Sequence, residues 1–156
     1  YFYNNEGTEA GGLIYGSFLD KNGKVEEANV HLSFDQYDQD QSFAVDAGQE
    51  RSGKFSMLRM NDVEDAPLSE RIEASERISR LPASERKDAW DKFNAVHTPL
   101  RTRVLLGRVE DRSSVLQLKD VEGRNRLILK VAADGNPSIQ LLDAQGKVGK
   151  ELQLTP

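Results

Sequence analysis

Cysteine is absent from the 156-residue chain, and histidine occurs only at positions 31 and 97. The absence of cysteine excludes disulfide bonds, thiolate zinc sites and cysteine nucleophiles. Two histidines so far apart in the sequence offer no metal-ligand spacing. We therefore predict no cofactor and no metal site.

Long hydrophobic runs and basic runs are also missing. No apolar stretch approaches the ~20 residues of a membrane-spanning helix. The net charge is -5 and no run of lysine and arginine forms a stripe, which argues against nucleic acid as a partner. The first residue is tyrosine, so we expect a processed or trimmed chain whose membrane contact, if any, runs through an upstream segment.

Short apolar segments separated by glycine-centred turns are abundant instead. Residues 13–19, 24–34, 43–45 and 54–60 have the composition and alternation of strands. Asp20-Lys-Asn-Gly23 suits a hairpin turn, because aspartate accepts backbone N–H bonds and glycine adopts a positive φ. We predict four or five antiparallel strands in residues 1–60, a glycine-rich loop before residue 13 and a turn over residues 47–53.

Residues 67–97 have few β-branched residues and much Glu, Arg and Ala, which predicts a helical hairpin divided near Pro82. Asp65 or Ser69 is the expected cap of the first helix. An apolar stripe on the second helix is expected to pack it, and consists of Ala89, Trp90, Phe93 and Val96.

Residues 101–154 return to alternation, with three more turns centred on Gly123, Gly135 and Gly146. Spacings of 12 and 11 residues between these glycines suit a meander of short strands. A β-solenoid also has a short period, but short polar loops favour hairpins. The alternating aliphatic residues from Leu116 to Leu154 are expected to face inward.

The predicted fold class is therefore α+β, mostly antiparallel β, with N-terminal strands, an inserted helical hairpin and a C-terminal β-meander. We expect a single domain over residues 1–156, with a β region at 1–60, the helical hairpin at 67–97 and the meander at 101–154. Two small subdomains separated by the helices are the alternative.

Catalytic motifs are weak. His31, Ser33 and Asp35 alternate on one strand face, but residues two apart are separated by ~6.6 Å along a strand. Members of a catalytic triad must lie within ~2.6–3.2 Å of one another. No Gly-x-Ser-x-Gly motif occurs. The sequence names no catalytic residue and favours a non-enzymatic protein.

The segment from His31 to Gln41 is the strongest candidate for binding. Its carboxylates could supply the oxygen ligands that Ca²⁺ prefers, but their spacing differs from that of an EF-hand loop. Such a loop needs glycine at its sixth position, and a loop that begins at Asp38 has Phe43 there. A glycosidase acid/base pair is a further reading of the same carboxylates. The candidate binding residues are His31, Asp35, Gln36, Tyr37, Asp38, Asp40 and Gln41.

Two N-terminal motifs carry a family resemblance: Gly11-Gly-Leu-Ile-Tyr-Gly16 and the run from His31 to Gln41, which contains Phe-Asp-Gln-Tyr-Asp-Gln-Asp-Gln. With the C-terminal turns at residues 123–126, 134–139 and 142–148, the chain resembles a family of uncharacterised bacterial proteins. Members usually carry a hydrophobic N-terminal segment. The resemblance implies an anchored or exported protein in the periplasm or cell envelope, and implies no activity.

Two functions are compatible with these observations. The first is a non-enzymatic extracytoplasmic module that binds a partner protein or assembles into a homo-oligomer, since a meander offers edge strands for pairing. The second is a small-ligand, glycan or Ca²⁺-binding domain, or a hydrolase, that uses the residues from His31 to Gln41.

Overall fold

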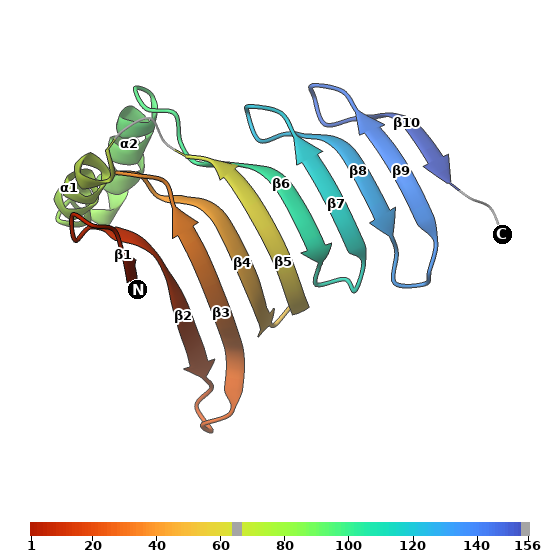
Figure 1. The fold of residues 1–156 in the computed structure, drawn as a ribbon, viewed down its shortest axis with the longest axis horizontal. Coiled ribbons are helices and arrows are strands. Elements are labelled where there is room, and N and C mark those ends of the chain that lie inside the picture. The colour runs from red at the N-terminus through yellow and green to blue at the C-terminus, as the bar shows by residue number, and fades with distance from the viewer. Residues whose placement is uncertain (64–66, 154–156) are drawn as a thin grey trace.

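The computed structural model describes residues 1–63 and 67–153. Its strands form one ten-stranded antiparallel sheet, in which each strand pairs with its neighbours in sequence (Figure 1). The strands are β1 (Phe2–Tyr3), β2 (Glu9–Leu19), β3 (Val25–Asp35), β4 (Gln41–Glu50), β5 (Gly53–Asp62), β6 (Arg101–Arg108), β7 (Ser114–Lys119), β8 (Asn125–Val131), β9 (Pro137–Leu142) and β10 (Val148–Gln153). The sequential strand order confirms the meander and rules out the solenoid alternative.

The glycine-centred turns have the predicted hairpin chemistry. In the turn after β2, the Asp20 carboxylate accepts the backbone N–H groups of Asn22 at 2.8 Å and Lys24 at 2.9 Å. The same two bonds recur at Asp120 and Asp143, and the third turn residue after each aspartate is a glycine with φ near 77°. A side-chain acceptor and a positive φ together close each loop in the same way.

Two strands are longer than the sequence indicated. β2 begins at Glu9, so Gly11 and Gly12 lie inside a strand and not in a loop. β4 continues to Glu50, because Gln49 pairs with Ala28 on one side and Lys54 on the other. The predicted turn over residues 47–53 was therefore too long.

The helices α1 (Leu68–Ser79) and α2 (Ala83–Asn94) form the expected hairpin between β5 and β6 (Figure 1). Each begins directly after a proline and has no side-chain cap, so the prediction of Ser69 as a cap was wrong. The alternative cap, Asp65, and the last aliphatic residue of the predicted meander, Leu154, lie outside the described residues. Ala74, Ile78 and Phe93 are the buried residues of the hairpin, whereas Val96 of the expected stripe is exposed because it follows the end of α2.

The paired residues define two faces of the sheet, because directly opposed residues point to the same side. We call one the apolar face. Its central row crosses from β2 to β10 and consists of Leu13, Leu32, Val45, Leu58, Leu106, Leu116, Leu129, Ile139 and Leu152. The other side, which we call the opposite face, carries residues that alternate with these, among them His31, Ser33, Asp46, Arg59 and Gln117.

Burial differs sharply between the faces near the helices. Ser33 and Ala44 on the opposite face are 4% and 0% exposed, whereas their apolar-face neighbours Phe34 and Val45 are 48% and 39% exposed. The backbone N–H of Leu68 at the start of α1 also donates to the carbonyl of Asp38, between β3 and β4. We therefore place the helical hairpin over the opposite face, which leaves the apolar face open.

Candidate functional site

The turn between β3 and β4 is tied to three other parts of the chain. The Tyr37 hydroxyl donates to the Glu6 carboxylate at 2.8 Å, and the Asp38 carbonyl accepts the Leu68 N–H at 3.1 Å. The Gln41 carbonyl accepts a bond from the Asn61 side chain at 2.9 Å. These bonds give the turn a structural part in joining the β1–β2 loop, α1 and β5.

The remaining polar groups of this turn bond locally or are buried. The Gln36 N–H donates to the Asp40 carbonyl at 3.2 Å, and the Asp40 carboxylate accepts the N–H of Gln41 at 2.8 Å. One oxygen of Asp35 and the Gln39 side-chain oxygen are buried without a hydrogen-bond partner in the structure. Burial raises the pKa of the Asp35 carboxyl, and the nearby carboxylates of Asp40 and Glu9 add to the rise.

His31 makes its side-chain contact away from this turn, in a cluster across three strands, although its charge acts on Asp35 and partly offsets the rise of that pKa. Its Nδ1 lies 2.6 Å from Oδ1 of Asp46, the residue directly opposite on β4. The other carboxylate oxygen, Oδ2, accepts a hydrogen bond from Nε of Arg59 on β5 at 2.8 Å and forms an ion pair with Nη2 of the same guanidinium at 2.8 Å. The structure therefore separates the seven candidate binding residues into the turn at 35–41 and the His31–Asp46–Arg59 cluster.

A groove of about 430 Å³ adjoins the cluster on the opposite face and also includes Asn29, Phe55 and Met57. His31 Nε2 and Asn29 Oδ1 are buried without partners in the structure. The groove lining contains no serine, threonine, lysine or tyrosine, so it places no hydroxyl or amine nucleophile beside the histidine. Within residues 1–63 and 67–153, no three His, Asp or Glu side chains converge to hold a metal ion.

Asp46 and Arg59 were not predicted as partners of His31. The signal was present in the hairpin, because a turn at residues 36–40 fixes the register of the strands on either side. That register pairs Phe34 with Phe43 and, three residues further from the turn, His31 with Asp46. Prediction of the contact with Arg59 required the register between β4 and β5 as well. The predicted turn over residues 47–53 was too long and obscured that register.

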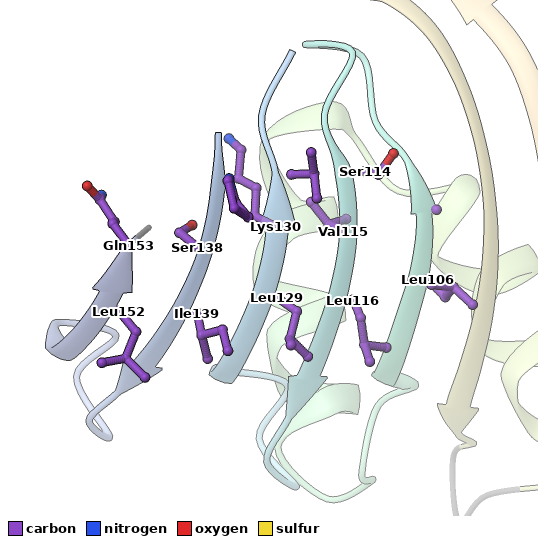
Figure 2. A pocket seen from close by; sticks show the side chains of 13 residues that line it. Leu106, Ser114, Val115, Leu116, Leu129, Lys130, Ser138, Ile139, Leu152 and Gln153 are labelled. Atoms are coloured by element: carbon purple, nitrogen blue, oxygen red, sulfur yellow. The ribbon is translucent and has the colours of Figure 1, made fainter. Parts of the chain in front are cut away.

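A groove of about 840 Å³ lies on the C-terminal half of the sheet. Figure 2 shows Leu106, Leu116, Leu129, Ile139 and Leu152 in a row across successive strands β6 to β10. These five side chains belong to the central row of the apolar face. Leu106 is 53% exposed and Leu152 is 56% exposed, so the groove is an open apolar surface.

The same surface continues across the N-terminal half of the sheet. Leu13, Tyr15 and Val30 are exposed on β2 and β3, as are Phe34 and Met60 nearer the helices. Phe2 stacks on Phe34, with ring centroids 6.2 Å apart. The aliphatic pairs from residue 116 onward do share one face as predicted, but that face is exposed and the prediction that it points into a core was wrong.

No protein-family model, curated protein or solved structure that we compared matches the chain. Neither helix in the described part of the chain is long and apolar enough to cross a membrane.

Proposed function

We propose that this chain is a non-enzymatic module for protein interaction or self-assembly, and that the apolar face of the sheet is its interaction surface. The observation that carries the proposal is the row of aliphatic side chains from Leu13 to Leu152, in which six residues are exposed and Leu32, Leu58 and Leu116 are half-buried. Monomeric proteins rarely expose a continuous apolar patch larger than ~300–600 Å². The family resemblance supports a location in the cell envelope.

The test is side-chain footprinting with hydroxyl radicals and mass spectrometry. Leu106 and Leu129 are compared in purified protein and in envelope extract, against the same residues in urea-unfolded chain. The proposal requires the reactivity of both leucines to fall well below their exposed fractions in the single chain, 53% for Leu106 and 36% for Leu129, in at least one native sample. Reactivity at those fractions of the unfolded value in both native samples would contradict an interaction through this face.

A second candidate function, binding of a small ligand, is supported by the groove beside His31. Asn29 and His31, which line the groove, each have a buried polar atom without a partner, Oδ1 and Nε2 respectively, whereas buried polar groups ordinarily have one. Thermal unfolding with Ca²⁺ and with a panel of sugars provides the test, with Asp46→Asn as the variant that releases His31. A shift in the wild type that the variant loses would support this function, and no shift with either ligand class would count against it.

A further inference from the structure

The sheet contributes almost nothing to a buried core. Across the described residues, the hydrophobic side chains that are nearly fully buried are Ala44, Ala74, Ile78, Phe93 and Val115. Three of them belong to the helical hairpin, and the two from the sheet, Ala44 and Val115, lie on the opposite face. The apolar face therefore supplies no nearly buried hydrophobic residue.

Such a sheet is incomplete as a folded unit. Ordering the backbone costs ~1–2 kcal/mol per residue, which burial of apolar surface must offset. Stable domains reach this balance by packing at least two layers, so that the apolar side of a sheet is covered. The helical hairpin covers part of the opposite face and is held there by the bond between Leu68 and Asp38. A separate layer is needed over the apolar face.

We propose that this layer is a second copy of the same chain, packed apolar face to apolar face, an inference that rests on the proposed function and names its partner. The central row has no charged residue from β2 to β10. In the flanking rows, Arg108 and Lys150 lie to either side of it, on β6 and β10. A two-fold dimer uses the same surface patch on both chains, so that patch must be complementary to itself. A surface without charge along its centre meets this requirement, because no like charges are brought together there.

The size of the face suits such a dimer. Nine strands at ~4.8 Å spacing, with three rows of side chains ~6.6 Å apart, cover on the order of 700 Å². A stable interface buries ~800 Å² per partner, and homodimer interfaces are the more apolar class. Two sheets packed in this way lie ~10 Å apart and form a sandwich. The His31–Asp46–Arg59 cluster and the helical hairpins would then lie on its outer sides.

Cross-linking of a single introduced cysteine tests the arrangement, because the natural chain has none. Leu106 occupies the middle strand of the nine in the central row, so its two copies lie near any two-fold axis of the dimer. Leu106→Cys should give a covalent dimer with a short bis-maleimide that spans the ~10 Å between packed sheets. Leu105→Cys, the adjacent residue on the opposite face, is the matched control and should give at least ~10-fold less dimer.

Sedimentation equilibrium of the purified wild type provides the second measurement. We expect a dimer, and Leu129→Glu should raise its dissociation constant at least ~10-fold, since each copy would bury a carboxylate. Gln117→Glu places the same charge on the opposite face and should leave the dissociation constant within ~2-fold. Equal cross-linking at residues 105 and 106 in a folded protein would overturn the face-to-face arrangement.

The outcomes separate this inference from the proposed function. A wild type that is monomeric when pure, but whose Leu106 and Leu129 are protected in envelope extract, would overturn the dimer and leave the interaction module in place. A monomer that binds phosphatidylcholine vesicles through the same leucines would overturn the dimer in favour of a lipid surface. A monomer with no protection in any sample would overturn both.

Discussion

Gly11 shows how one residue position constrains the first hairpin. It lies within β2 with φ of 134°, and a Cβ added there would lie 2.2 Å from the carbonyl oxygen of Ser33 on β3. Gly11→Ala therefore combines a strained backbone with a clash against a neighbouring strand, and we expect a loss of ~1–3 kcal/mol in the free energy of unfolding. Gly16→Ala is the control, because nothing lies within 4 Å of its added Cβ. Urea unfolding at one protein concentration measures both, and equal losses would contradict the close-approach explanation.

The Asp35 carboxyl gives the fold a specific pH dependence. Burial raises its pKa above the ordinary 3.8, with further contributions from Asp40 and Glu9. Because the folded pKa exceeds the unfolded one, the folded state binds more protons between the two values, and this group lowers stability as the pH rises through that window. Asp35→Asn should therefore raise the melting temperature at pH 7, and the gain should vanish below pH ~3.8.

Asp134 supplies a control of opposite sign for that experiment. The backbone N–H of Asn136 lowers the pKa of the Asp134 carboxyl, so its ionised form stabilises the turn above the unfolded pKa and this stabilisation is lost as the pH falls. Asp134→Asn should lower the melting temperature at pH 7. A loss of stability in Asp35→Asn at pH 7 would show that the buried carboxylate is compensated in the folded state.

At the scale of elements, the helical hairpin depends on very few buried side chains. Ile78 in α1 is 2% exposed, whereas Ile72 in the same helix is 50% exposed. Ile78→Ala should cost ~2–5 kcal/mol, because it removes buried methyl groups and leaves a cavity. Ile72→Ala removes the same atoms from a half-exposed position and should cost less than ~1 kcal/mol. Thermal unfolding followed by far-ultraviolet circular dichroism compares them, and similar losses would mean that α1 packs through a different face.

The sequence predicted the elements well where the signal is local. Turns at Asp20, Asp120 and Asp143 follow from side-chain chemistry within five residues, and the helices follow from composition. Gly11 was harder, because its role comes from the approach of Ser33 across the sheet and not from its own neighbours. The contact between His31 and Asp46 was hard to predict for the same reason, because the two residues lie on adjacent strands and not near each other in the sequence. Their contact required the register of the β3–β4 hairpin, and the contact with Arg59 also required the β4–β5 register, which the overlong turn prediction obscured.

At the scale of the whole molecule, alternation alone does not tell which residues are buried. A period of two shows that Leu116, Leu129 and Ile139 share a face, but a face is buried only if another layer covers it. The sequence contains one amphipathic hairpin, and the structure places it over the opposite face. The amount of apolar surface left uncovered is therefore a property of topology, because it depends on how the ten strands lie side by side (Figure 1).

A homodimer whose protomers bury few apolar side chains on their own should unfold with a melting temperature that depends on protein concentration. Dissociation and unfolding are then coupled, and mass action favours the folded dimer as the concentration rises. We expect the melting temperature of the wild type to increase steadily over a 100-fold range of concentration. Leu129→Glu should melt at a lower temperature at every concentration, and Gln117→Glu should follow the wild type. A wild-type melting temperature independent of concentration would mean that the sheet is stable with its apolar face uncovered.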